Sequence, residues 1–325
     1  MDLSICIVSY NCRDLLVKCL RSIEEHSGGL EVEVVVVDNA SADGTVEMLT
    51  DDFPAVRVIA SEENLGFAGG TNLAVENASS DTLLLLNPDT EVRERALERL
   101  AGLVQRRPEV GACGPAVYRP DGRLQHTCHA FPKLWLSLIG QFGLHRAFPK
   151  SSVFGAYDMT WSDHDEPRPV EWLSGVCIAT TRAVWDRVGP LDEGYFMYAE
   201  DIDWCYRLAQ AGYDRWFLPA AEIDHYEGGS WGDASQERIL ASHKAMFRFF
   251  GKHHGHLAEI AERLLVMTGG MIRGSFWNIM GPVLGEQAEI VSNCDIHFRV
   301  AKTAIAMEEM YLETVSYTHL RAHET

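Results

Sequence analysis

The chain has 325 residues, 46% of them hydrophobic, which is enough to form the packed core of one large or two medium domains. It carries 28 basic and 47 acidic residues, a formal net charge of −19, and no long basic run offsets that charge. Counterion release from a nucleic acid would therefore contribute little, so nucleic acid is not an expected partner. An acidic protein that binds an anionic substrate needs local positive charge, which a metal ion can supply.

The cysteines and the N-terminus indicate the compartment. Eight cysteines are scattered along the chain without a Cys-x-x-Cys pair, a pattern typical of buried reduced thiols rather than a disulfide scaffold or a zinc site. The N-terminus has no basic segment ahead of its first apolar run, so the sequence does not favour a secretory signal. We expect a cytoplasmic protein.

The first third of the chain alternates short apolar runs with short helical patterns. Strands are predicted at four places, residues 3–8, 32–37, 56–60 and 83–86. Such βαβ units have right-handed crossovers and form a parallel sheet, in which the loops that follow the strands share one edge. The polar loops expected to converge there are residues 9–11, 38–43, 64–72 and 87–89.

The rest of the chain is less regular. Residues 119–171 contain several prolines and no sustained period apart from a helix predicted over 134–142, so we expect a loop-rich lid or binding element. Further strands are predicted over 172–180 and 214–218, and further helices over 93–105, 182–188, 202–211 and 236–250. The segment 257–284 is mostly apolar but is interrupted too early for a membrane span, and both an interfacial amphipathic helix and a packing helix fit it.

The loops offer groups that suit a nucleotide. Tyr10 can give a base a flat contact, and Asp38, Asn39 and Asp43 can read its edge, although ordinary loop and cap chemistry also explains these polar residues. The glycines between 66 and 70 permit close approach of the backbone to a diphosphate, but they are also common in turns.

Asp89 follows the leucine strand 83–86, at the edge where open α/β sheets bind ligands. A carboxylate there can hold Mg2+ or Mn2+ against a diphosphate, and the ion offsets the charge of a diphosphate leaving group. His225 follows a later strand and is the second candidate ligand, although a single histidine is more often structural.

Glu200, Asp201 and Asp203 lie together after the aromatic stretch 195–198. Acidic residues in a first helical turn are favoured by the helix dipole, which is one explanation. The other explanation is catalytic: three carboxylates close together beside apolar side chains can raise the pKa of one of them toward the range of a general base.

Seven short stretches, in order, resemble the family 2 glycosyltransferases of the GT-A fold, and within that family the bacterial rhamnosyltransferase-like members. They are residues 7–11, 37–45, 63–72, 86–89, 172–175, 199–203 and 225–230, and they span roughly residues 3 to 250. Each stretch alone is a weak signal, whereas seven in the family's order are specific.

The resemblance implies an α/β architecture with a Rossmann-like, mostly parallel sheet flanked by helices. The GT-A domain would cover residues 1–250, with a nucleotide-binding half over 1–118 and an acceptor and catalytic half over 119–250. A helical extension would follow over 251–315. The last residues, 316–325, have no apolar period or cap and resemble translated adapter sequence, so we expect them to be non-native.

The resemblance also implies the activity. It is an inverting, metal-dependent transfer of a sugar, with rhamnose as first expectation, from a dTDP- or UDP-linked donor to a glycan or lipid-linked acceptor of the cell envelope. Asp201 would be the base, with Glu200 beside it, and Asp89 and His225 would hold Mg2+ or Mn2+. One departure weakens the expected metal site, because this chain has Asn87-Pro88-Asp89 where many relatives have Asp-x-Asp.

The remaining site residues follow from the same resemblance. The donor side would consist of Ser9, Tyr10, Asn11, Asp38, Asn39, Asp43, Asn64, Gly66, Phe67, Gly69, Asn72 and Asn87. The acceptor side would consist of Trp172, Ser174, Gly175 and Asp203. We expect the protein at the inner face of the cell membrane if the segment 257–284 makes peripheral contact.

Two other functions are alternatives. A sugar-phosphate nucleotidyltransferase would need a glycine-rich, basic loop after the first strand, and residues 9–13 contain one basic residue and no glycine. A non-catalytic nucleotide-sugar-binding scaffold would have no need of Asp89, Asp201 and His225 together.

Overall fold

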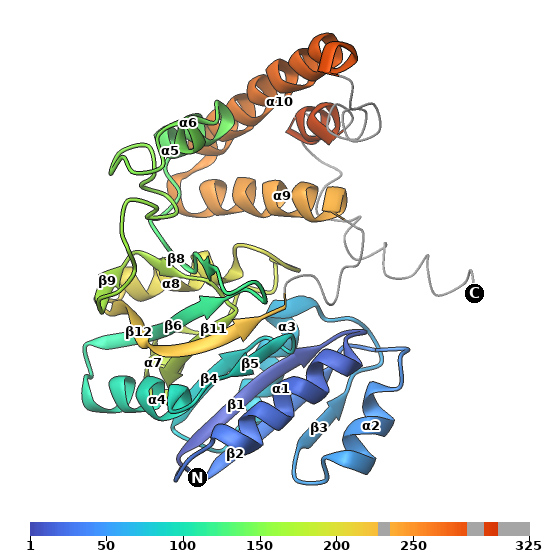
Figure 1. Ribbon diagram of the computed structural model, residues 1–325, viewed down its shortest axis with the longest axis vertical. Helices are drawn as coiled ribbons and strands as arrows, with labels where there is room; N and C mark the ends of the chain where they lie inside the picture. The colour runs from blue at the N-terminus through green and yellow to red at the C-terminus, as the bar shows by residue number, and fades with distance from the viewer. Residues whose placement is uncertain (227–234, 285–295, 305–325) are drawn as a thin grey trace. The chain divides into compact units, whose positions relative to one another are not determined.

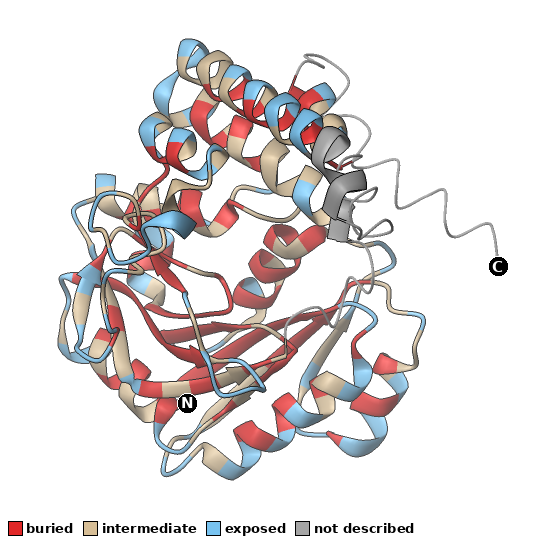
Figure 2. Cartoon of the chain, turned by 45° about the horizontal axis from the view of Figure 1, so that its top comes forward, coloured by how far each residue is buried: buried red, intermediate tan, exposed pale blue. Residues whose placement is uncertain are grey.

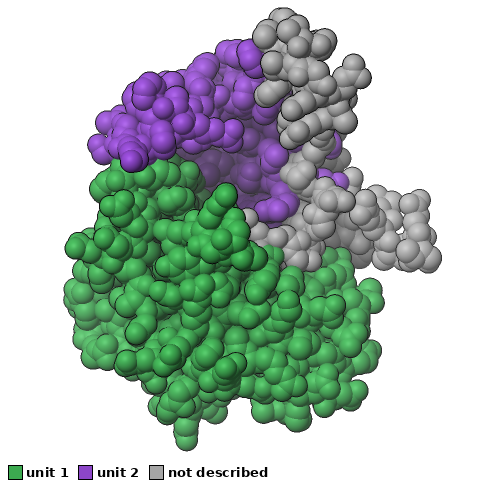
Figure 3. Space-filling model, in the orientation of Figure 1, with its two compact units in different colours: residues 1–131, 156–196, 200–232 green, residues 132–155, 197–199, 233–325 purple. Residues whose placement is uncertain are grey.

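The computed structural model describes residues 1–226, 235–284 and 296–304 (Figure 1). The chain divides into two compact units, coloured separately in Figure 3. Unit 1 comprises Met1–Phe131, Ala156–Phe196 and Glu200–Gly232, and unit 2 comprises Pro132–Gly155, Met197–Ala199 and Asp233–Thr325. This division does not follow the predicted boundary at residue 250, and the limits of the glycosyltransferase domain stay a prediction.

Unit 1 begins with the predicted βαβ units. Its elements are β1 (Leu3–Ser9), α1 (Arg13–His26), β2 (Val32–Asp38), α2 (Thr45–Asp52), β3 (Arg57–Ala60), α3 (Gly66–Asn77) and β4 (Thr82–Leu86). The strands pair in parallel in the order β3-β2-β1-β4, and α3 packs on β1 and β2. The polar loops after β1, β2 and β4 therefore share one edge of the sheet, as the sequence predicts.

The second part of unit 1 extends the same sheet. It adds β5 (Thr90–Val92), α4 (Ala96–Arg106), β6 (Val110–Tyr118), β9 (Arg168–Val170), β11 (Cys177–Thr181), α7 (Arg182–Val188), α8 (Glu200–Gln210) and β12 (Asp214–His225), with β7 (Leu124–Gln125) paired to β6. The main path through the sheet is β3-β2-β1-β4-β11-β6-β12-β5. β11 runs antiparallel to its neighbours β4 and β6, so the predicted mixed α/β fold is confirmed.

Three predicted elements have different limits. The expected strand 172–180 is divided into β10 (Trp172–Leu173) and β11, because the backbone N–H groups of Ser174 and Gly175 turn to Thr127 and Asp201; β10 pairs instead with β8 (Cys128–His129). The helix predicted from residue 93 starts at Ala96, because Arg93 N donates to Glu222 O beyond the end of β5 and Arg95 has φ 62°. β12 continues beyond the predicted 218 to His225.

The core of unit 1 lies around the sheet. Every residue of β1 and β4 is buried, and Figure 2 shows the central strands almost wholly in the colour of buried residues. A helical face of α1 joins this core through Leu16, Cys19, Leu20 and Ile23, at the spacing predicted. The described cysteines are buried with free thiols, and burial raises the pKa of Cys6 and Cys19 to about 12, so both thiols stay protonated. Cys294 lies outside the described residues.

Unit 2 is helical. It contains α5 (Leu134–Gln141), α6 (Leu144–Ala147), α9 (Ser235–His254) and α10 (His256–Leu284), and α10 packs against α5 and α9. Phe247, Val266, Ile296, Val300 and Ala304 form its small apolar core. No helix in the described part of the chain is long and apolar enough to span a membrane.

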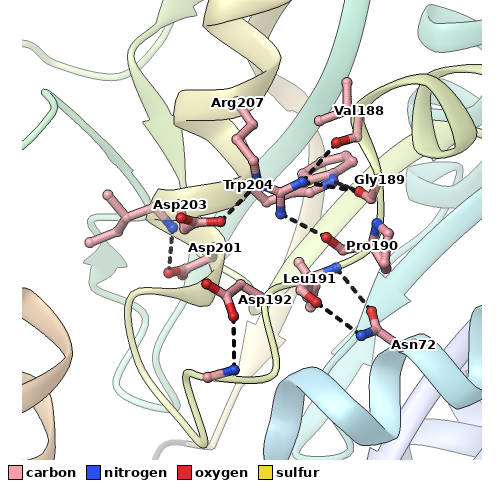
Figure 4. A network of polar contacts seen from close by, with 12 residues as sticks. Asn72, Val188, Gly189, Pro190, Leu191, Asp192, Asp201, Asp203, Trp204 and Arg207 are labelled. Carbon is pink, nitrogen blue, oxygen red and sulfur yellow. Dashed lines mark hydrogen bonds and ion pairs between the residues drawn. The ribbon is translucent and has the colours of Figure 1, made fainter. Parts of the chain in front are cut away.

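A polar network connects α8 to the loop before it and to α3 (Figure 4). Arg207 Nε lies 2.8 Å from the fully buried Asp203 carboxylate, and its remaining nitrogens donate to the carbonyls of Val188, Gly189 and Pro190. Asn72 on α3 holds the same loop, because its amide donates to Leu191 O at 3.0 Å and accepts from Leu191 N at 2.9 Å. The network fixes the helix that begins with Glu200 and Asp201.

We expect Asp203→Ala to lower the free energy of unfolding by about 3 kcal/mol, because it leaves the mostly buried Arg207 guanidinium without its carboxylate. Urea denaturation followed by circular dichroism measures this. Gln210→Ala, at the exposed end of the same helix, is the matched control and should change stability by less than about 0.5 kcal/mol. Equal stability of the two variants would show that the ion pair is not needed.

Candidate active site

The loops after β1 and β2 are joined to each other. Asn11, at φ 48°, donates its backbone N–H to Ser41 Oγ at 2.9 Å and accepts the N–H of Ala42 at 2.8 Å. Asp43 accepts the N–H of Arg13 at 2.9 Å. Partial burial raises the pKa of Asp43, but hydrogen bonds from Thr45 and Arg13 outweigh it and hold the pKa below its usual value. The predicted donor residues Asn11 and Asp43 thus shape this loop pair.

Asp38 and Asn39 stand at the end of β2, both 2% exposed. Asp38 accepts the N–H of Ser41 at 3.0 Å, and Asn39 donates its side-chain amide to Gly66 O at 2.9 Å. One oxygen of each side chain, Oδ1, is buried without a hydrogen-bond partner among the described residues. A buried acceptor without a donor costs about 1–3 kcal/mol, so N–H or O–H groups of a ligand would be bound favourably here.

Ser9 and Tyr10 complete this side. Ser9 is buried at the end of β1, with its carbonyl accepting the N–H of Asn39 at 2.8 Å. Tyr10 is 36% exposed, which leaves its ring accessible for contact with a flat base.

The glycine-rich stretch at the start of α3 has a close backbone neighbour. Gly66 has φ 71°, and a Cβ there would lie 2.3 Å from Phe196 O. Phe67 N donates to that same carbonyl at 2.8 Å, and Asn64 Oδ1 accepts from Gly66 N at 2.9 Å. Only glycine fits position 66. Gly69 is also tight, with a Cβ position 3.1 Å from the Leu65 side chain.

Asp89 and His225 meet, although 136 positions separate them in sequence. The antiparallel pair β5–β12 places His225 opposite Thr90, and Tyr226 N donates to Asp89 O at 2.8 Å. Asp89 Oδ1 then lies 3.2 Å from His225 Nε2, with both side chains buried.

The chemistry of this pair fits a shared cation. His225 Nδ1 lies 2.8 Å from Gln125 Oε1; when Nδ1–H donates to that oxygen, the lone pair of Nε2 faces the Asp89 carboxylate. Two acceptors facing each other need a proton or a metal ion between them. Among the described residues no three His, Cys, Asp or Glu side chains gather as a metal site, and Asp89 and His225 are the two candidate ligands that this part of the chain offers. Mg2+ commonly takes its other ligands from substrate phosphates and water.

Asn87 lies beside this pair and is partly exposed. Its backbone N–H donates to Val176 O at 2.9 Å, and its carbonyl accepts the Thr90 hydroxyl at 2.7 Å. The turn between β4 and β5 is thereby fixed, and with it the position of Asp89.

Asp201 is oriented by two backbone N–H groups. Its Oδ2 accepts from Gly175 at 2.8 Å, and its Oδ1 accepts from Ile202 at 2.8 Å. Burial raises the pKa of Asp201, while these two hydrogen bonds and the charge of His129 reduce that rise. The carboxylate is therefore fixed in direction and is a stronger base than an exposed aspartate.

Glu200 has a different environment. It is buried, and its Oε2 has no hydrogen-bond partner among the described residues. Burial, together with the charges of Asp201 and Asp203, raises the pKa of Glu200 well above its usual value, which favours its protonated form.

Of the predicted acceptor residues, Gly175 contacts Asp201, and Trp172 packs against His129. Trp172 stacks on His129 with ring centroids 4.2 Å apart and an angle of 19° between planes, and its Nε1 donates to Ala130 O at 2.9 Å. His129 Nδ1 lies 3.1 Å from Asp158 Oδ1. Gly175 stands between Phe67 and Asp201, since a Cβ there would contact both.

Some side chains near the site were not predicted. They are Gln125, which contacts His225, and His129, which stacks on Trp172 and contacts Asp158. All three lie in the irregular region, where the sequence has no repeating pattern that would predict their positions. The pairing of β8 with β10, which sets His129 opposite Trp172, identifies them only once the fold is known.

Two predicted site residues have structural contacts instead. Asp203 is ion-paired with Arg207, and the Asn72 amide is hydrogen-bonded to Leu191 and Glu193. Their predicted contacts with substrate stay predictions. Residues 227–230 of the last matching stretch lie outside the described residues.

Comparison with known proteins identifies the family of the chain. A family model described as Glycosyl transferase family 2 matches residues 4–163. The N-acetylglucosaminyl-diphospho-decaprenol L-rhamnosyltransferase of Mycobacterium tuberculosis is 30% identical over 238 residues, covering 69% of this chain and 76% of that protein. The rhamnosyltransferase WbbL of Escherichia coli is 27% identical over 236 residues, covering 68% of this chain and 82% of that protein.

Solved structures share the fold. The mannosyltransferase PcManGT of Pyrobaculum calidifontis, in complex with GDP-Man and Mn2+, matches with a TM-score of 0.57 at 16% identity, covering 94% of this chain and 86% of that chain. GalNAc-T7, solved with UDP, GalNAc and Mn2+, matches with a TM-score of 0.54 at 14% identity, covering 98% and 58%. By its sequence relatives and its GT-A fold, the chain belongs to glycosyl transferase family 2 and is a glycosyltransferase similar to bacterial rhamnosyltransferases.

Proposed function

We propose that the protein transfers a sugar, with inversion at the anomeric carbon, from a nucleoside diphosphate donor to a lipid-linked glycan acceptor. The observation that carries this proposal is the Asp201 carboxylate, which two backbone N–H groups orient and burial makes more basic. Such a group suits removal of a proton from an acceptor hydroxyl as its oxygen attacks the sugar. Attack on the face opposite the leaving diphosphate, in one displacement, inverts the configuration.

Glu200 supports this assignment, because its raised pKa makes it take the protonated form more readily than a glutamate exposed to water. A neutral Glu200 adds no second negative charge beside the base. Each Asp201 oxygen accepts one backbone hydrogen bond and keeps a second lone pair for a proton. Asp201 is therefore the base in this proposal, and Glu200 tunes its surroundings.

Asp89 and His225 would hold a divalent cation, Mg2+ or Mn2+. A bound cation would offset the charge of the leaving diphosphate. Asp89 contributes a carboxylate oxygen and His225 contributes Nε2, while Gln125 fixes the histidine ring through Nδ1. The buried, unpartnered oxygens of Asp38 and Asn39 would accept hydrogen bonds from the nucleoside.

The substrates are proposed from the relatives. The M. tuberculosis relative is named as an L-rhamnosyltransferase that acts on a decaprenyl-diphosphate-linked sugar. We infer a rhamnosyl donor, with dTDP as its nucleotide, and a polyprenyl-diphosphate-linked acceptor. With such an acceptor, the protein would act at the inner face of the cell membrane.

Asp201→Asn should lower transfer by about a hundredfold or more while donor binding is retained, because the amide cannot take the hydroxyl proton. The assay is release of dTDP from dTDP-rhamnose with a polyprenyl-diphosphate-linked N-acetylglucosamine acceptor, and calorimetry gives donor affinity. Asp186→Asn, an exposed residue of α7, is the control and should behave as wild type. Transfer by Asp201→Asn at the control's rate would refute the base assignment.

Asp89→Asn and His225→Gln should each weaken Mn2+-dependent binding of dTDP by about tenfold or more. Calorimetric titration with dTDP, with Mn2+ and with EDTA, measures this without turnover. His26→Gln, at the end of α1, controls for loss of a histidine. If Mn2+ strengthens dTDP binding equally in the wild type and both variants, the cation is held elsewhere.

A further inference from the structure

The long helix α10 buries two charged side chains and exposes several apolar ones, although Val266 also joins the core of unit 2. Its charged Glu262 and Arg263 are 2% and 7% exposed, and Glu259 pairs with Arg263 at 2.7 Å. The side chains it exposes include Leu264 and Met271, each about half exposed. A surface helix of a globular protein normally directs its charges outward and its apolar face inward.

The neighbouring helix α5 exposes a similar face. Trp135, Leu138 and Phe142 are exposed at spacings of three and four residues, whereas Leu136 and Ile139 between them are buried. These three side chains therefore lie along one side of α5.

The two helices are fastened to each other. Arg273 on α10 donates to Gln141 O, at the end of α5, at 2.6 Å, and Gly269 permits close approach of the Gln141 side chain. Their exposed apolar side chains thus belong to one packed pair. We define the α5–α10 surface as Trp135, Leu138, Phe142, Leu264, Met271 and Ile272. Exposed apolar side chains concentrated in this way mark a binding surface.

The charge around this surface is positive, in a chain whose net charge is −19. Residues 122–157 contain no aspartate or glutamate, and the part within unit 2 carries the exposed Lys133, Arg146 and Lys150. α10 has no acidic residue after Glu262. Arg273 has no carboxylate partner among the described residues, and the charge of Arg146 opposes its own. Anionic groups would relieve this repulsion.

We propose that the α5–α10 surface docks the protein onto a bilayer containing anionic phospholipids. Aromatic and aliphatic side chains would enter the acyl boundary, and Lys133, Arg146 and Lys150 would meet the headgroup phosphates. A second copy of the chain fits less well, because a two-fold interface would bring the same cations together without acidic partners. The predicted contact through 257–284 is thereby extended to α5, and the inference does not depend on the donor or the base proposed above.

The test is flotation of the full-length protein with vesicles of two compositions, pure phosphatidylcholine and an equal mixture with phosphatidylglycerol. The wild type should float with the mixed vesicles. Trp135→Ser with Leu138→Ser should lower the partition coefficient about tenfold, and Arg146→Gln with Lys150→Gln should lower it about tenfold on the mixed vesicles alone. Trp161→Ser and the pair Arg95→Gln with Arg106→Gln, exposed in unit 1, are the matched controls.

A second readout identifies the surface directly. Acyl chains brominated near the headgroup should quench the tryptophan fluorescence of the wild type, and Trp135→Phe should float normally while losing most of that quenching. Absence of flotation, equal losses in the controls, or quenching unchanged in Trp135→Phe would overturn the proposal. So would a dimer in sedimentation that Trp135→Ser with Leu138→Ser converts to monomer, because the surface would then be covered by a second copy.

Discussion

The hydrogen bond from Gly175 N to the Asp201 carboxylate, at 2.8 Å, is the contact on which the catalytic side of unit 1 depends. To make it, the backbone must leave the sheet between β10 and β11, which divides what would otherwise be one strand. The interruption exposes an N–H group, and α8 brings the carboxylate that accepts it. The Arg207–Asp203 pair and the Asn72 contacts then hold α8 and its preceding loop in place. This backbone donor thus links the turn between β10 and β11 to Asp201, the proposed base, which Ile202 N also orients.

The metal side depends on a different constraint, the antiparallel pairing of β5 with β12. β5 has three residues, but its pairing sets His225 opposite Thr90 and so beside Asp89. The pairing would thereby give the Asp89 carboxylate a second proposed metal ligand, although residue 87 is an asparagine. Both sides of the site therefore arise where the sheet departs from a simple parallel order. The parallel strands β1 and β2 carry the proposed nucleoside side, where one buried side-chain oxygen each of Asp38 and Asn39 has no hydrogen-bond partner among the described residues.

The amino-acid sequence was sufficient for the parallel half of the fold, because β-branched and leucine runs alternate there with helical periods. It also placed Asp89 after the leucine strand and Asp201 at the start of a helix, whereas His225, predicted to follow a strand, is the last residue of β12. It could not reveal β5, because three residues are too few to show the alternation of apolar and polar side chains that identifies a strand. It could not separate Asp201 from Asp203 by pattern, because both lie in the first turn of α8; only packing shows that Asp203 faces Arg207 and Asp201 faces Gly175. His129 and Gln125 were missed because their positions depend on strand pairing within an irregular region.

The central claim is that a base in unit 1 drives a single displacement of a nucleoside diphosphate from a sugar. The anomeric configuration of the transferred sugar tests this most directly, determined by NMR of the product from a donor of known configuration. A single displacement gives a product whose anomeric configuration is opposite to that of the donor. A product with the donor's own configuration would contradict it, because retention needs two displacements or a different mode of attack, and Asp201 would no longer serve as the base proposed.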